Sequence, residues 1–263
     1  MDLVLLKLGG SLITEKAREE TPRREVIDRL ASEIARATAG ASCRLVVAHG
    51  SGSFGHVAAR RHGIGKGPLD PDQLAGACRT QERAAALHQI VIAALLEAGA
   101  RPFSLAPSSC VVAAAGQPVE IASAPLLLAL ERGLLPVLYG DVVLDRDWGA
   151  SICSTERLFT LLARTLPGRG LSIRRSIWLG ETDGLWDAAG CTVARVTRDT
   201  FAAALQAIGA PAGTDVTGGM RHRLETALDL AALGIPSLLA NGLTPGLLER
   251  ALRGEAVTGT EVL

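Results

Sequence analysis

Short runs of apolar residues alternate along the chain with longer segments in which apolar side chains recur every three or four positions. The short runs predict buried strands, and the longer segments predict helices with one buried face. The predicted strands are 3–8, 44–48, 101–105, 135–143, 176–180, 237–242 and, as an edge strand, 258–262. The predicted helices are 22–39, 72–98, 126–132, 158–166 and 224–233.

The first of these helices has the clearest predicted limits. Thr21 followed by Pro22 is typical of an N-cap and a first helical position, and Gly40 ends the pattern. Residues 63–71 are rich in Gly and Pro and predict a connection without regular structure. Residues 149–157 are predicted to form a polar loop that enters the next helix.

The length of 263 residues allows one large α/β domain or two small ones. Apolar residues make up 48% of the chain, which is enough for a substantial core. Aromatic residues are scarce, and the predominance of Ala, Leu, Val and Gly suits helices packed on a sheet. The formal net charge of zero argues against a general nucleic-acid binder, which would carry a basic excess.

The five cysteines are scattered, odd in number and without the spacing of a metal site, so we expect reduced thiols of a cytosolic protein. The N-terminus enters an apolar strand without a basic leader, and no apolar run is long enough to span a bilayer. These features predict a soluble, cytoplasmic protein with neither nucleic acid nor membrane as a partner.

The candidate chemistry begins with the glycine-rich stretch from His49 to His56, HGSGSFGH. It follows a predicted strand, and residues 57–61 are expected to begin a helix. Backbone N–H groups point outward at such a turn and the helix N-terminus carries partial positive charge, so this arrangement commonly holds a phosphate. The glycines let a ligand approach closely, and His56 would add a charge and a hydrogen bond.

The same stretch matches Gly-x-Gly-x-x-Gly, the dinucleotide-binding fingerprint. That fingerprint also needs an acidic residue at a second strand end about 20 residues further on. Here the corresponding region, 66–71, has the composition of a loop. A tight turn with two ordinary hydrogen-bonding histidines is a further interpretation. The stretch alone leaves these alternatives open.

Two further loops have phosphate-binding character. Lys7 is the one charged residue of the first predicted strand and needs a partner if that strand is central, whereas on an edge strand it would reach water. A glycine pair and a serine follow at 9–11, and Lys16 is close enough to reach the same site. The third loop spans 215–223 and leads into a helix, with Arg223 in the first turn.

Three other segments are candidates for ligand contact. The helix 72–98 places Ala77 and Thr80 on one face, which is either plain core or the wall of a site near the glycine loop. Gly140 and Asp141 lie near a predicted strand end, where ligands collect in open α/β sheets. The loop containing Asp183 either holds a metal-bound nucleotide, caps backbone amides or forms an ordinary turn.

Three phosphate-type loops, each with a cationic residue nearby, imply several phosphate groups bound together, such as a nucleoside triphosphate and an anionic acceptor. No Gly-x-x-x-x-Gly-Lys-Ser/Thr stretch occurs, which excludes an ordinary P-loop enzyme. Phosphoryl transfer needs in-line positioning and positive charge on the oxygens of the moving group. Lys7, Lys16 and Arg223 are the candidates for that charge.

In four motifs the chain resembles the amino acid kinase superfamily and, within it, the isopentenyl phosphate kinase family. The motifs occur in the expected order from residue 3 to the C-terminus, and the histidine-flanked glycine loop is the most specific of them. They are Lys7–Ser11, His49–His56, Tyr139–Asp141 and Asp215–Met220.

The resemblance implies an open αβα sandwich with a mainly parallel central sheet, formed as one domain over 1–263 and usually assembled as a homodimer. Residues 1–170 would form the acceptor-binding half and residues 171–263 the nucleotide-binding half. The implied reaction moves the γ-phosphoryl group of Mg-ATP onto isopentenyl phosphate, giving isopentenyl diphosphate for isoprenoid synthesis. ATP and Mg²⁺ are therefore the implied cofactors, and no protein ligand to a metal is assigned.

The resemblance also implies residue roles. Lys7 would bridge the transferring phosphoryl group, and His56 would bind the acceptor phosphate. The catalytic candidates are Lys7, Lys16, His56, Glu156 and Arg223. The predicted ATP contacts are Lys7, Gly9, Gly10, Ser11, Gly52, Asp183, Gly219 and Arg223. The predicted acceptor contacts are Gly50, Ser51, Gly52, Gly55, His56, Ala77, Thr80 and Gly149.

Three positions depart from the family pattern. Ser154-Thr155-Glu156 stands where Ser-Gly-Asp is usual, and that Asp helps to organise the catalytic lysines, so Glu156 is a longer replacement. Residues 180–184 replace Thr-Asp-Val-Asp-Gly. Arg223 replaces a lysine; it keeps the charge and can bridge two oxygens, but the two side chains are not equivalent. These departures concern rate and nucleotide preference more than reaction type.

Two other functions stay open from the sequence. A related kinase acting on a phosphonate of the fosfomycin type or on an acyl carboxylate would also suit a histidine at position 56. A nucleotide binder without kinase activity is the second, and the departures at Thr155, Glu156 and Arg223 motivate it. The small-residue face around Ala77, Thr80 and Ala84 favours an acceptor with a short hydrocarbon tail.

Overall fold

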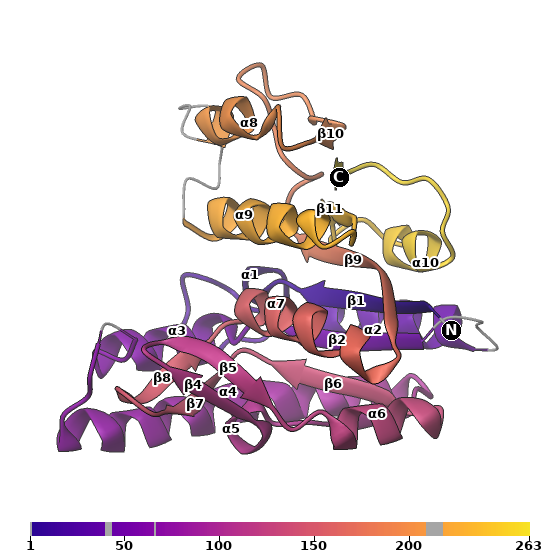
Figure 1. The fold of residues 1–263 in the computed structure, drawn as a ribbon. Coiled ribbons are helices and arrows are strands. Elements are labelled where there is room, and N and C mark those ends of the chain that lie inside the picture. Colours follow the sequence, from indigo (N-terminus) through magenta and orange to yellow (C-terminus); the bar gives the residue numbers. More distant parts are fainter. Residues whose placement is uncertain (1, 40–43, 66, 209–217) are drawn as a thin grey trace.

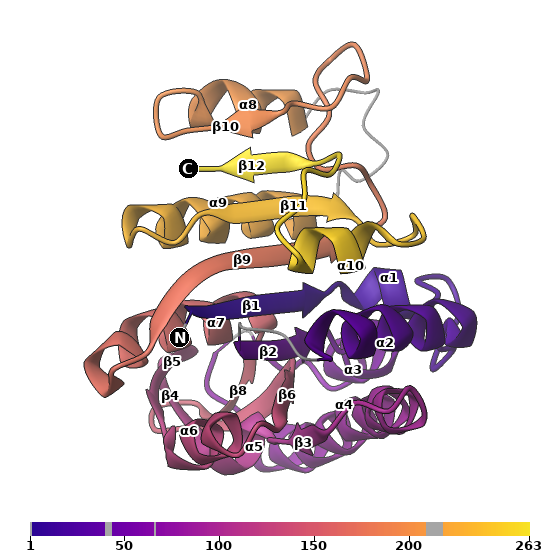
Figure 2. The same ribbon diagram turned by 90° about the vertical axis from the view of Figure 1, so that its right-hand side faces the viewer.

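The fold is organised around an eight-stranded sheet (Figures 1 and 2). We describe it from a computed structural model, which covers residues 2–39, 44–65, 67–208 and 218–263. Neighbouring strands are parallel except for β11 and β12. In spatial order the strands are β10 (Arg195–Val196), β12 (Thr260–Val262), β11 (Ser237–Asn241), β9 (Ser172–Gly180), β1 (Asp2–Leu8), β2 (Arg44–His49), β6 (Leu135–Tyr139) and β3 (Pro102–Ser104).

Helices cover both faces of this sheet because its strands are apolar on both sides. In β1, Leu3 and Leu5 belong to one core cluster, whereas Leu6 and Leu8 belong to the other. The first cluster includes side chains from α6 (Ala124–Glu131), α7 (Thr155–Thr165), α8 (Phe201–Ile208) and α9 (Gly218–Ala232). The second includes side chains from α1 (Gly10–Ile13), α2 (Arg24–Thr38), α3 (Gly52–Arg61), α4 (Pro71–Glu97) and α10 (Leu247–Leu252). The predicted open αβα sandwich with a mainly parallel sheet is thus confirmed.

A second, four-stranded sheet lies beside α4 and α7. The chain enters it at Gly140, which donates its N–H to the carbonyl of His49 at 2.8 Å. The prediction of one strand over 135–143 was therefore wrong, because the run divides between two sheets at Gly140. The strands of the second sheet, in spatial order, are β5 (Gln117–Ile121), β4 (Val111–Ala114), β7 (Asp141–Asp145) and β8 (Gly149–Cys153).

The predicted polar loop over 149–157 was also wrong. Its first half is β8, which pairs antiparallel with β7, and its second half already belongs to α7. The sequence of β8, Gly-Ala-Ser-Ile-Cys, contains one large apolar residue, so it gave no strand pattern, although Ala150, Ser151 and Cys153 are buried. Two short elements, α5 (Pro107–Cys110) and the 3₁₀ turn Pro167–Arg169, complete the chain order.

Several predicted limits needed correction. Helix α2 begins at Arg24, because Pro22 forms a β-bridge with Thr14. Strand β12 is not an edge strand, because β10 lies outside it. Helices α3, α7 and α9 begin earlier than predicted, within the polar or glycine-rich residues that precede their apolar faces.

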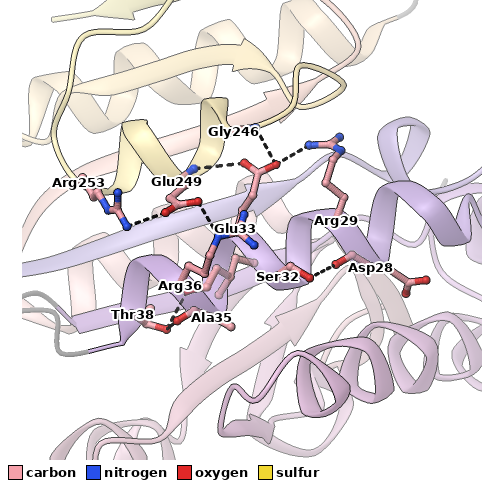
Figure 3. A network of polar contacts seen from close by, with 11 residues as sticks. Asp28, Arg29, Ser32, Glu33, Ala35, Arg36, Thr38, Gly246, Glu249 and Arg253 are labelled. Carbon is pink, nitrogen blue, oxygen red and sulfur yellow. Dashed lines mark hydrogen bonds and ion pairs between the residues drawn. The ribbon is translucent and has the colours of Figure 1, made fainter.

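A buried carboxylate joins α2 to α10, which pack side by side on the same face of the sheet (Figure 3). Glu33 is 1% exposed and pairs with Arg29 at 2.7 Å. It accepts the N–H groups of Gly246 at 3.0 Å and of Glu249 at 3.3 Å. Arg36 in turn contacts Glu249 at 2.8 Å. Glu33 thus satisfies backbone donors at the start of α10 that the helix itself cannot pair.

Two further findings concern the helices and the cysteines. Within the described ranges, none of the helices is both long and apolar enough to cross a membrane. The four cysteines in those ranges, Cys78, Cys110, Cys153 and Cys191, are free thiols.

Candidate active site

The adjacent parallel strands β1, β2 and β6 end at a cavity of about 970 Å³. Backbone hydrogen bonds join the end of β1 to its neighbours β9 and β2, from Gly9 to the carbonyl of Leu179 at 2.9 Å and from Gly50 to that of Leu8 at 3.0 Å. The first turns of α3, α7 and α9 also line the cavity. Because helix N-termini present unpaired N–H groups and partial positive charge, this arrangement favours bound anions.

The first two glycine loops are in direct backbone contact. A Cβ atom on Gly10 would lie 2.7 Å from the backbone nitrogen of Gly52, and one on Gly50 would lie 2.8 Å from the nitrogen of Gly10. Gly52 also has φ of +51°, a conformation that favours glycine. Side chains at these positions would force the two loops apart.

Lys7 lies at the cavity on the α7 side of the sheet. It follows Leu3 and Leu5 on the same face of β1 and is 5% exposed. Its ammonium forms an ion pair with Glu156 in the first turn of α7, and it lies 5.4 Å from the ring centre of Trp178. The longer side chain of Glu156 therefore reaches the lysine, as a carboxylate at this position is expected to do.

The two groups of this pair influence each other's protonation. Burial lowers the pKa of Lys7 and the charge of Arg223 lowers it further, whereas Glu156 raises it. Burial alone would raise the pKa of Glu156, but the charge and hydrogen bond of Lys7 outweigh it and bring that pKa to about 2. The carboxylate is therefore ionised at neutral pH and supports the charged lysine.

His56 extends from α3 into the same cavity and is exposed to it. The surrounding protein withdraws the ring from bulk water and lowers its pKa, Glu156 opposes this, and Lys7 and Arg60 add to it. The imidazole is therefore mainly neutral at neutral pH in the absence of an anion. A bound phosphate would raise the pKa of His56, because it favours the protonated ring.

His49, at the other end of the same motif, is a core residue with no exposure. Its Nδ1 donates to the carbonyl of Gly50 at 3.1 Å, so its Nε2 accepts the hydrogen bond from Nδ1 of His88 at 3.0 Å. Both rings stack on Tyr139. Burial lowers the pKa of His49 to about 4 and keeps the ring neutral. The two histidines of the motif thus have different environments, and only His56 lines the cavity.

The other two predicted cations also line the cavity. Arg223 is 8% exposed, and a Cβ atom on Gly180 would lie 2.5 Å from its Nη1, so the guanidinium lies against the backbone at the end of β9. Lys16 is half-exposed, with its Nζ 3.9 Å from Glu181, which also binds Arg23 at 2.8 Å. The loop after β9 thus contributes a carboxylate beside Lys16.

Most of the predicted site residues meet in this one cavity. Those that line it are Lys7, Gly9, Gly10, Ser11, Lys16, Gly50, Ser51, Gly52, Gly55, His56, Thr80, Glu156, Gly219 and Arg223. The first part of the third glycine loop, 215–217, lies outside the described residues, and the remainder, 218–223, belongs to α9.

Three predicted contacts do not line the cavity. Ala77 is buried behind its wall, in a small apolar cluster with Ile64 and Val142. Gly149 begins β8, and Asp183 lies in the turn after β9. Their roles stay predictions.

Thr155 and Thr14 are among the lining residues for which the sequence predicted no site role, and Asp141 was noted only as lying near a strand end. Thr155 donates from Oγ1 to the carbonyl of His49 at 3.0 Å. Asp141 accepts the N–H groups of Ser108 and Val142 at 3.0 and 2.8 Å. Thr14 contacts both glycine loops. The sequence signals available for these residues were a position in the first turn of a helix or next to a glycine. Their contacts join distant parts of the chain, so the sequence pattern did not reveal them.

The surroundings of the glycine loop differ from a dinucleotide-binding unit. The fingerprint needs a second strand end about 20 residues after the loop. Here α4 begins at Pro71, within that span. Among the residues that the structure describes, no group of three or more His, Cys, Asp or Glu side chains could hold a metal ion.

Comparison with known proteins agrees with this geometry. The model of the amino acid kinase family matches residues 2–241. The chain belongs to the amino acid kinase family. It is 36% identical over 278 residues to the isopentenyl phosphate kinase of Methanothermobacter thermautotrophicus, covering 99% of this chain and 98% of the relative. It is 33% identical to the isopentenyl phosphate kinase of Haloferax volcanii, covering 90% of each.

A solved structure of an isopentenyl phosphate kinase superimposes on this family member with a TM-score of 0.82 and 31% sequence identity. The match covers 99% of this chain and all of that structure. The resemblance predicted from the four motifs is therefore confirmed along nearly the whole chain, which is a kinase.

Proposed function

We propose that this kinase transfers the γ-phosphoryl group of Mg-ATP to isopentenyl phosphate, producing ADP and isopentenyl diphosphate. One observation carries the proposal: Lys7 and His56 line a single cavity together with the first turns of three helices. Two groups of phosphates can therefore be held on either side of one lysine. The identity of relatives that match over nearly their full length supports the choice of acceptor.

In this proposal the two interlocked glycine loops hold the two substrates. The loop at 9–11 binds the ATP phosphates with Gly219 and Arg223, and the loop at 50–55 binds the acceptor phosphate with His56. Lys7 lies between them and neutralises the charge on the transferring group. Such a reaction needs little covalent chemistry from the protein, because positioning and electrostatic stabilisation lower most of the barrier.

The cavity wall beyond His56 suits a short hydrocarbon tail. Ile64, Thr80, Ala84, Val142 and Ile152 line it. The hydroxyl of Thr80 donates to the carbonyl of Gly76 at 2.9 Å, so its one donor is already used within α4. An apolar tail bound here would be removed from water, and it would not deprive the hydroxyl of Thr80 of a hydrogen-bond partner.

We also propose the arrangement at the level of the whole chain. Residues 1–170 form the acceptor-binding half and residues 171–263 the nucleotide-binding half of one domain, and two chains form a homodimer in the cytoplasm. Light scattering on the purified protein tests the dimer, and a monomeric mass at micromolar concentration would reject it.

A product assay tests the function. The purified protein is incubated with Mg-ATP and isopentenyl phosphate, dimethylallyl phosphate, fosfomycin or a carboxylate, and both ADP and the phosphorylated product are measured. We expect diphosphate formation from isopentenyl phosphate. Unchanged isopentenyl phosphate would reject this substrate. Nucleotide binding in calorimetry without ADP formation on any acceptor would support a non-catalytic nucleotide binder instead.

A further inference from the structure

Thr14 connects the two glycine loops through its hydroxyl group. It follows α1 and has no solvent exposure. Its Oγ1 donates to the carbonyl of Gly10 at 2.8 Å and accepts the N–H of Ser53, 39 positions further on, at 3.0 Å. One side is the loop after β1, and the other is the first turn of α3.

Both hydrogen bonds satisfy a definite need. Ser53 is in the first turn of α3, where backbone N–H groups have no partner within the helix. The N-cap residue of that helix, Ser51, makes no side-chain capping bond. Thr14 therefore provides from another segment the acceptor that an N-cap side chain commonly provides. Its single hydroxyl hydrogen is used on Gly10, so the direction of both bonds is determined.

The shape of the contact matches the hydrogen bonds. A Cβ atom on Gly52 would lie 2.3 Å from Oγ1 and 2.7 Å from Cγ2 of Thr14. Thr14 thus occupies the space that a side chain at position 52 would need. Closer approach of the loops is opposed by steric contact with Thr14, and their separation here would break one of its two hydrogen bonds.

We propose that Thr14 is a positioning residue that sets the separation and angle between the ATP loop and the acceptor loop. This inference rests on the proposed function, because it concerns the transfer between those loops. Thr14 acts through Gly10 and Ser53, since its single donor is used within the protein and the residue has no solvent exposure. In-line transfer is sensitive to such geometry, and a displacement of about 1 Å can lower a rate by about 100-fold.

The experiment compares three variants. Thr14→Val keeps the shape and removes both hydrogen bonds, and Thr14→Ser keeps the hydroxyl. Thr38→Val is the matched control, because Thr38 makes a similar bond to the carbonyl of Ile34 at 2.8 Å in α2 but does not line the cavity. We expect kcat for isopentenyl phosphate to fall about 10- to 100-fold in Thr14→Val, with both KM values within about threefold of wild type. Thr14→Ser and Thr38→Val should keep kcat within about threefold.

Amide exchange of Ser53, followed by nuclear magnetic resonance, provides a readout that needs no acceptor. It should accelerate at least about tenfold in Thr14→Val and stay slow in Thr14→Ser. Unchanged exchange, an unchanged kcat in Thr14→Val, or equal losses in Thr14→Val and Thr14→Ser would each overturn the inference. A wild-type protein that transfers to none of the acceptors would reject the proposed function, while the exchange result would still decide whether Thr14 holds the loops.

Discussion

The ion pair between Lys7 and Glu156 allows a quantitative prediction. Both side chains are buried, with 6% and 12% exposure, so solvent does not weaken their interaction as it would on the surface. Replacing one partner of a buried pair leaves the other charge uncompensated and costs about 3–5 kcal/mol. For a protein of this size we therefore expect Glu156→Gln to lower Tm by roughly 6–20 °C.

The same substitution should change the pH dependence of activity. Glu156 is the group that raises the pKa of Lys7, while burial and Arg223 lower it. In Glu156→Gln the lysine therefore loses its proton more readily, and a neutral lysine cannot stabilise the charge on the moving phosphoryl group. We expect kcat to fall about 100-fold at about pH 8 and to recover partly as the pH is lowered and Lys7 regains its proton.

Stability in acid provides an independent check. The pKa of Glu156 falls from its ordinary 4.5 to about 2 on folding, so between these values the unfolded chain binds more protons than the folded one. Stability due to this group is complete above pH 4.5 and is lost as the pH falls toward 2. Glu156→Gln should lack this part of the acid dependence.

Two controls make the experiment specific. Glu156→Asp keeps the negative charge and should lower Tm by less than Glu156→Gln. Glu120 pairs with Arg146 on the surface, where its side chain is 58% exposed, so Glu120→Gln should shift Tm by at most about 4 °C. Calorimetry and the ADP-release assay measure these quantities. A Glu156→Gln protein with wild-type Tm and a wild-type pH profile of kcat would refute the reasoning.

Three further perturbations test the site and the fold. Replacing His56 by alanine should abolish most turnover. In the wild type the acceptor KM should rise with pH, because burial lowers the pKa of this ring and the acceptor phosphate favours its protonated form. A KM that is constant between about pH 6 and about pH 8 would contradict this role. Gly10→Ala should lower kcat at least about 100-fold, because the new Cβ atom would lie 2.7 Å from the neighbouring loop. Gly168→Ala is its control, since a Cβ atom there meets nothing within 4 Å, and equal losses in both variants would reject the steric argument. Glu33→Ala should cost about 3–5 kcal/mol in denaturant unfolding, because Arg29 loses its carboxylate and two backbone donors lose their acceptor. Asp28→Ala, at an exposed position of the same helix, should cost less than about 1 kcal/mol, and similar values for the two variants would contradict the assigned role of the buried carboxylate.

Local patterns were sufficient for most of the α/β layout. The predicted strands 3–8 and 237–242 and the predicted helix 72–98 have apolar patterns that their own residues determine, and they appear within one or two positions of the prediction. The run 135–143 misled, because its apolar pattern continues through Gly140 while its hydrogen-bonding partners change from β2 to β8. The apolar pattern of a strand indicates that it is buried, but it does not indicate which neighbouring strand provides the backbone hydrogen bonds.

The candidate site divides in the same way. The sequence alone determined the chemical groups: the glycines, the lysine in the first strand and the histidine-flanked motif. Only the tertiary structure decided that His56 faces the cavity while His49 packs in the core, and that Glu156 reaches Lys7 from 149 positions away. The physical reason is that parallel strands bring their carboxyl ends to one edge of a sheet irrespective of their separation along the chain. Contacts made across that edge depend on strand order, which no local pattern contains.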